Sequence, residues 1–195
     1  DVLGIADLVY KILQTWRAHA SNKKRGVRIH VATAYFVPKP FTPFQWEKQI
    51  TPQEYLRRCK LLKSHFYSKS IVYDYHSPDL SRLEAVFARG DRRLGPVIET
   101  AVKNGARLDG WDEYFNYARW YDAFRECGID EDFYTTRGYG EEEILPWDTI
   151  DVGVSKAFLK RERRRAYDGK VTPDCRHGCA GCGANSLLRE VACDA

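Results

Sequence analysis

The chain lacks methionine altogether: none of its 195 residues is Met, and the sequence opens at Asp1 inside a helical pattern. We expect from these two features that the sequence is a piece of a longer protein. Long apolar runs are absent too, because charged residues interrupt every hydrophobic stretch well before the ~20 residues that a transmembrane helix needs. Neither a signal peptide nor a membrane partner is expected, and a cytoplasmic location is predicted.

A strong charge of one sign is also missing. The formal net charge of +4 is too small to indicate binding to nucleic acid or to a membrane surface by itself. What the chain does contain is 44% hydrophobic and 13% aromatic residues, which is typical of a folded protein and not of a disordered one. The length predicts one domain with an appendage.

The six cysteines are unevenly distributed, and three of them lie within eight residues near the end of the chain. Their spacing is C-x3-C-x2-C, at Cys175, Cys179 and Cys182, and three glycines accompany them. Glycine allows such a loop to curl around a small centre, and crowded thiolates repel one another unless a cation neutralises them. The pattern predicts a metal or iron–sulfur site. A disulfide would leave one thiol unpaired, and reduced thiols in a tail are the remaining alternative.

The spacing does not decide which metal is bound. The same triplet holds the [4Fe–4S] cluster in radical S-adenosylmethionine enzymes, where electron transfer from the cluster to the cofactor releases a deoxyadenosyl radical. Zinc is the alternative, with His177 or Cys193 as a fourth ligand. Cys59 falls in one predicted helix and Cys127 at the end of another, and we interpret both as packed thiols.

The first 90 residues alternate between helix and strand patterns. Strand, crossover helix and strand in this order are typical of a parallel α/β sheet, although two strands are too few for an independent one. Thr51 and the proline after it predict a capped helix start. The predicted helices span 1–20, 51–67 and 77–89, and the predicted strands span 27–37 and 70–76.

After residue 90 helices and loops predominate. We predict a short helix at 93–103, an aromatic-rich helix that Asp112 caps and that runs to Glu126, an irregular stretch at 129–153, and a basic helix at 156–167. The aromatic helix is more often core than a surface for stacking nucleobases. The cations of the basic helix either form a solvated face or bind RNA.

Two features lie directly after the predicted strands, and therefore at the same end of the predicted parallel sheet. One is the proline-rich loop at 38–46, which either stops the strand or faces a substrate. The other is His76, a candidate polar group at this end, for which capping or solvation is the commoner role. Tyr73 and Tyr75 are interpreted as core or lining residues.

Several runs together resemble one family. They are Phe-Val-Pro-Lys-Pro-Phe-Thr-Pro-Phe-Gln-Trp at 36–46, Asp-Glu-Tyr-Phe at 112–115, Thr-Thr-Arg-Gly-Tyr at 135–139, Leu-Pro-Trp-Asp at 145–148, and the cysteine loop. The chain is similar, over nearly its whole length, to large radical S-adenosylmethionine proteins with a cobalamin-binding-like N-terminal domain, relatives of uncharacterised fused Fe–S oxidoreductases.

This resemblance implies an α/β fold: residues 1–90 would be the C-terminal strands and helices of a partial (β/α)6 TIM-like barrel. A helical, aromatic-rich extension would follow at 91–170, and a cysteine-rich tail that binds a metal or cluster at 171–195. The cysteines that bind S-adenosylmethionine would lie upstream, in the remainder of the polypeptide, so the chain would not act alone. Cys175, Cys179 and Cys182 would hold an auxiliary iron–sulfur cluster. The alternative is a zinc-stabilised module that binds RNA or a partner protein.

Overall fold

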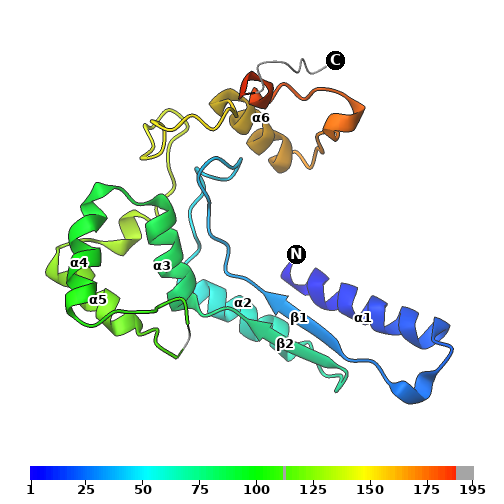
Figure 1. The fold of residues 1–195 in the computed structure, drawn as a ribbon. Helices are drawn as coiled ribbons and strands as arrows, with labels where there is room; N and C mark the ends of the chain where they lie inside the picture. The colour runs from blue at the N-terminus through cyan, green and yellow to red at the C-terminus, as the bar shows by residue number, and fades with distance from the viewer. Residues whose placement is uncertain (112, 188–195) are drawn as a thin grey trace. The chain divides into compact units, whose positions relative to one another are not determined.

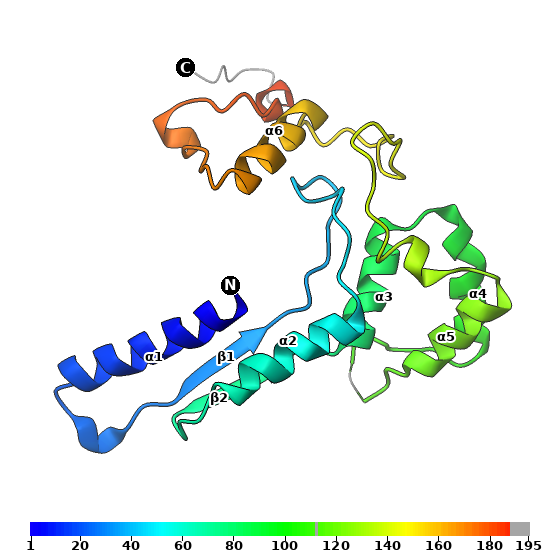
Figure 2. The same ribbon diagram turned by 180° about the vertical axis from the view of Figure 1, so that it is seen from behind.

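A computed structural model describes residues 1–111 and 113–187, which form two compact units (Figures 1 and 2). Unit 1 consists of residues 1–36 and 50–83, and unit 2 contains the remaining described residues. The described chain is α/β, with six α-helices and a two-stranded parallel sheet. The α/β class is therefore confirmed, whereas a sheet of this size does not show a barrel.

Unit 1 is a strand–helix–strand unit preceded by a helix. It contains α1 (Val2–His19), β1 (Ile29–Thr33), α2 (Pro52–Ser64), β2 (Ile71–Tyr75) and the start of α3 (Pro78–Arg89). The strands pair in parallel, with Ile29 opposite Ile71 and Thr33 opposite Tyr75. Parallel neighbours need a long crossover, which α2 supplies.

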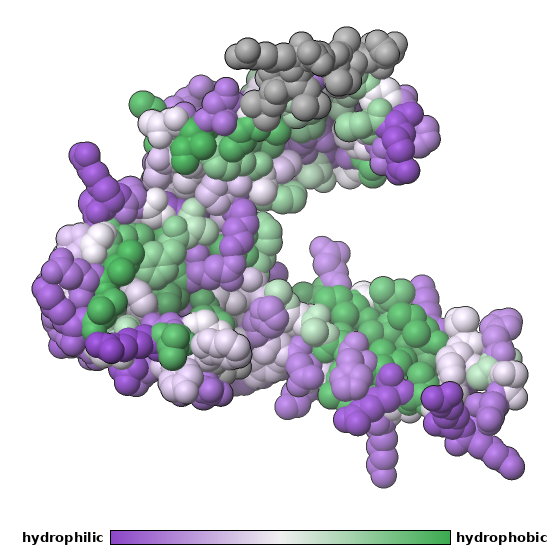
Figure 3. All heavy atoms as spheres, in the orientation of Figure 1, coloured by the Kyte–Doolittle hydropathy of each residue, from purple (hydrophilic) through white to green (hydrophobic). Residues whose placement is uncertain are grey.

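Local sequence explains where the elements of unit 1 begin and what they bury. The Thr51 hydroxyl accepts a hydrogen bond from the Glu54 amide at 3.2 Å, as the predicted N-cap of α2 should. The apolar positions of α1 recur at helical spacing, and Leu13 is buried while Leu8 stays 58% exposed. Figure 3 shows hydrophobic residues gathered over part of this unit.

Two predicted element bounds were wrong. The first strand is shorter than the predicted 27–37, because β2 offers backbone partners only as far as the residue opposite Thr33. The aromatic helix, α5 (Tyr117–Glu126), begins later than predicted because Asn116 accepts the capping hydrogen bond from the Ala118 amide at 3.0 Å. Asp112, the predicted cap, lies outside the described residues.

Unit 2 places α4 (Gly95–Lys103) against α5 and carries α6 (Lys156–Tyr167) further along the chain. One hydrophobic cluster draws on three separate segments of this unit. Its buried members are Trp46, Tyr139, Leu145, Trp147 and Leu159. No helix in the described part of the chain is long and apolar enough to span a bilayer.

The segment 37–49 belongs to unit 2, although it follows β1 of unit 1 closely in the sequence. The Trp46 carbonyl accepts a hydrogen bond from the Tyr139 amide at 2.9 Å, and the Gln49 amide donates to the Thr135 carbonyl at 2.9 Å. Domain limits at 1–90, 91–170 and 171–195 stay a prediction; the observed units divide the chain within α3 and around this inserted segment.

Candidate metal loop and adjacent pocket

The cysteine loop begins with a short turn at Cys175–His177. The Asp174 carboxylate caps this turn, because its Oδ1 accepts a hydrogen bond from the Arg176 amide at 2.9 Å. Gly178 follows with a φ of 145°, a conformation that side chains rarely adopt. Cys175 and Cys179 are exposed, so this first part of the loop presents its sulfur atoms at the surface.

Backbone amides donate to two of the three sulfur atoms of the loop, those of Cys179 and Cys182. The Gly181 amide lies 3.4 Å from the Cys179 Sγ, and the Ala184 amide lies 3.4 Å from the Cys182 Sγ. In both cases the donor is two residues after the cysteine. Amide hydrogen bonds of this kind stabilise negative charge on sulfur and tune clusters that thiolates bind.

The end of the loop is fixed to the residues that lead into α6. The Ser155 amide donates to the Cys182 carbonyl at 2.8 Å. Gly183 has a φ of 96°, and a Cβ there would meet the Gly153 carbonyl at 2.9 Å, so a larger residue would push the two segments apart. Arg161 of α6 also donates to the Ala180 carbonyl. The loop is thus docked on the helix that precedes it.

In the described part of the chain, no three His, Cys, Asp or Glu side chains are grouped closely enough to hold a metal ion. His177 and Cys179 both line a cavity of about 250 Å³ beside α6, whereas Cys193, the other fourth-ligand candidate, lies outside the described residues. The assignment of Cys175 and Cys182 as ligands with Cys179 stays a prediction.

The two remaining described cysteines are placed as packed thiols. Cys59 is 3% exposed in a cluster with Tyr35 and Tyr55 of unit 1. Cys127 follows α5, where its Sγ lies 3.6 Å from the Thr100 hydroxyl. Neither thiol belongs to the loop, which makes them natural controls for it.

The cations of α6 are largely engaged by carboxylates of unit 2. Arg163 pairs with Glu47 at 2.7 Å and with Glu141 at 2.9 Å, and Arg164 pairs with Glu141 at 3.0 Å. The hydrogen bond from Arg164, and further that from Arg163, lowers the pKa of Glu141. Lys160 pairs with Glu142 in the same way at 2.5 Å. Cations so neutralised are poor ligands for a phosphate backbone.

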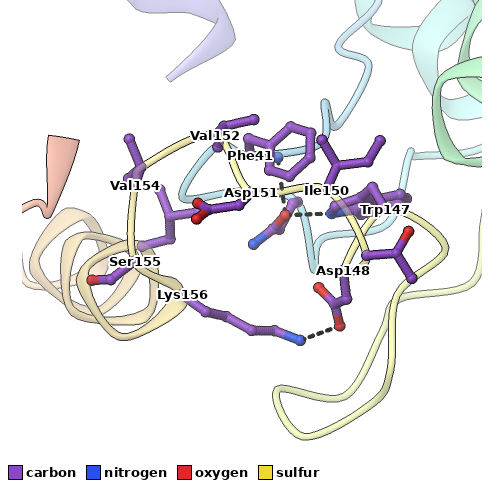
Figure 4. Close-up of a pocket in the computed structure, with 12 residues that line it drawn as sticks. Phe41, Trp147, Asp148, Ile150, Asp151, Val152, Val154, Ser155 and Lys156 are labelled. Atoms are coloured by element: carbon purple, nitrogen blue, oxygen red, sulfur yellow. Dashed lines mark hydrogen bonds and ion pairs between the residues drawn. The ribbon is translucent and has the colours of Figure 1, made fainter. Parts of the chain in front are cut away.

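A pocket at the start of α6 was not predicted. Gln45 and Trp147 belong to two of the runs that carry the family resemblance, and they meet here: the Trp147 indole donates to Gln45 Oε1 at 2.7 Å. The pocket has a volume of about 480 Å³ (Figure 4). Asp148, Asp151 and Lys156 supply its charged groups. The sequence offered only the polar residues around 145–156 as an indication of this pocket. Gln45, which binds Trp147, lies about a hundred positions earlier, so no local pattern joins the two.

The features predicted to share one end of the sheet lie in different units. His76 follows β2 in unit 1, where its amide donates to the Thr33 carbonyl at 3.1 Å and its carbonyl accepts from the Tyr55 hydroxyl at 3.2 Å. The proline-rich loop belongs to unit 2. Tyr73 is half-buried, and its hydroxyl lies 2.8 Å from the Thr33 hydroxyl, whereas Tyr75, predicted with it as a core or lining residue, is 41% exposed.

Comparisons with known proteins add no relative. No protein-family model matches the chain, and neither the curated proteins nor the solved structures include a significant match. The resemblance to radical S-adenosylmethionine proteins therefore stays a prediction.

Proposed function

We propose that Cys175, Cys179 and Cys182 bind an iron–sulfur cluster. The observation that carries this proposal is the pair of amide-to-sulfur hydrogen bonds at Cys179 and Cys182, which would stabilise bound thiolates. The docking of the loop through Ser155 and Gly183 supports it, because a fixed backbone limits the entropy that metal binding must overcome. Bound here, such a cluster would supply one-electron transfer.

We further propose that the chain is the C-terminal part of a radical S-adenosylmethionine enzyme and that the loop is its auxiliary site. Parallel sheets normally have more than two strands and are covered on both faces. The two-stranded sheet of this chain would therefore be part of a larger sheet. The pattern β1–α2–β2–α3 is the repeating unit of a (β/α) barrel. On this proposal the upstream polypeptide supplies the cofactor site, and the chain alone is inactive.

The alternative of an RNA-binding helix gains no support from α6, since Glu47, Glu141 and Glu142 neutralise much of its charge. Zinc remains the competing occupant of the loop, because thiolates and an imidazole such as that of His177 are the ligand types that zinc prefers. The experiment must therefore separate iron from zinc.

The test is anaerobic reconstitution of the chain with iron and sulfide, followed by metal and acid-labile sulfide analysis. We expect a brown protein that binds both elements, and a Cys179→Ser variant that loses the bound iron almost completely. Cys127→Ser is the matched control and should keep its iron, because that thiol lies outside the loop. Equal iron in the Cys179→Ser variant, or stoichiometric zinc with no sulfide in protein purified without oxygen, would overturn the cluster assignment.

A further inference from the structure

The pocket at the N-terminal end of α6 has the dimensions of a small-molecule site. Its volume of about 480 Å³ lies within the usual range of ~300–1,000 Å³ for ligand pockets. Phe41 and Trp147 contribute aromatic surface, and Val154 and Leu159 contribute aliphatic surface. All lining residues belong to unit 2.

The side chain of Gln45 is fixed in one orientation. It is 2% exposed, and its Oε1 accepts hydrogen bonds from the Phe41 amide at 3.0 Å and from the Trp147 indole at 2.7 Å (Figure 4). Because both partners are donors, only the oxygen can face them, and this settles which way the amide is turned. Among the described residues, the hydrogen bonds of this side chain all use Oε1, and Gln45 lines the pocket, so its Nε2 is available as a donor to a bound molecule.

The carboxylates of Asp148 and Asp151 line the same pocket. Asp151 uses Oδ1 to accept from the Gly153 amide at 2.8 Å, which fixes the carboxylate and leaves most of its acceptor capacity unused. Asp148 differs, because its Oδ2 already accepts from the Leu145 amide at 2.8 Å and from Lys156 at 2.6 Å. The pocket thus carries two carboxylates, those of Asp148 and Asp151, and one ammonium group, that of Lys156, and this excess of negative charge disfavours an anionic ligand.

We propose that this pocket binds a neutral purine base of the guanine type. The ring carbonyl would accept from Gln45 Nε2, and the adjacent ring N–H and exocyclic amine would donate together to the Asp151 carboxylate. The flat base would pack against Phe41 and the neighbouring apolar residues. This binding depends neither on a metal in the cysteine loop nor on the function proposed above.

The experiment is calorimetric titration of the full 195-residue chain, free of metal, with guanosine. Saturable binding is expected. Gln45→Glu keeps an oxygen for both donors but replaces the NH2 group, and it should weaken binding by about tenfold or more. Asp151→Asn is an exposed change that should not disturb folding, and it should weaken binding to a similar extent because an NH2 group would then face the donors of the base.

Asp168→Asn is the matched control: it makes the same chemical change at the other end of α6, and affinity should be unchanged. Adenosine lacks the carbonyl edge and should bind about tenfold more weakly than guanosine, and inorganic phosphate should not bind. The proposal would be overturned if guanosine shows no saturable binding, if either pocket variant binds it as tightly as the parent chain does, if adenosine binds as tightly as guanosine, or if inorganic phosphate binds alone.

Discussion

At the scale of single residues, Arg89 stands out as a charged side chain that is fully buried and forms no salt bridge with a carboxylate of the described residues. Its guanidinium donates to the Thr135 and Arg137 carbonyls at 3.1 Å each and lies 4.4 Å from the centre of the Tyr139 ring. Burial lowers the pKa of Arg89. These contacts fix the segment whose Tyr139 amide bonds to Trp46, so one arginine organises much of the backbone around the core of unit 2.

Asp91 yields a pH-dependent prediction. Its hydrogen bonds with Arg93 lower the pKa of this carboxyl from 3.8 to about 2, and its side chain is 26% exposed. Because the folded pKa lies below the unfolded one, the stabilisation is complete above pH ~5 and is lost as pH falls through 3.8 towards 2. Asp91→Asn keeps the cap but removes the charge, and should cost about 1 kcal/mol at neutral pH after allowance for solvent screening.

The measurement is urea-induced unfolding of the parent chain and of Asp91→Asn at neutral pH and near pH 3. The difference in unfolding free energy should shrink as the pH falls. A difference that stays constant between the two pH values would contradict the ion-pair explanation.

At the scale of elements, the sequence located most helix starts because capping is a local interaction. The predicted start of the basic helix at residue 156 is correct, because Ser155 caps α6 with its Oγ accepting from the Phe158 amide at 3.2 Å. The start of α5 was misplaced because acidic and amide side chains before a helix are nearly equivalent caps, and only the observed hydrogen bond distinguishes Asn116.

The cap of α2 can be tested directly. Replacing Thr51 by Ala removes the acceptor for the Glu54 amide and should destabilise the protein by about 1 kcal/mol in chemical unfolding. Thr51→Ser retains the hydroxyl and should lower the free energy of unfolding much less. If Thr51→Ser lowers the free energy of unfolding as much as Thr51→Ala does, the stabilisation comes from packing of the threonine methyl group and not from the cap.

At the scale of the molecule, the core of unit 2 depends on residues that are far apart in sequence. Trp46 is 1% exposed among aromatic residues from 139–147 and from α6. Sequence patterns assigned the proline-rich segment to the end of a sheet, whereas its side chains belong to this second core. Periodicity reports which residues are buried but not which distant segment buries them.

Trp46→Ala should therefore destabilise unit 2 by about 3–5 kcal/mol, because the large cavity left behind cannot be filled locally. Thermal and urea unfolding measure the loss. Trp111→Ala is the matched control: that indole is 64% exposed, and its removal should change the unfolding free energy by no more than ~0.5 kcal/mol. Equal effects of the two substitutions would contradict the assignment of Trp46 to a core.

The sequence by itself determined the α/β class, the parallel pairing of two strands through a crossover helix, most helix limits, and the cysteine loop as the place to look for a metal. These are set by local periodicity, capping and spacing. Only the tertiary structure decided that Gln45 meets Trp147, that Glu47 neutralises Arg163, and that the loop docks through Ser155. Such contacts join residues that are distant in sequence, and they arise from packing that no local pattern encodes.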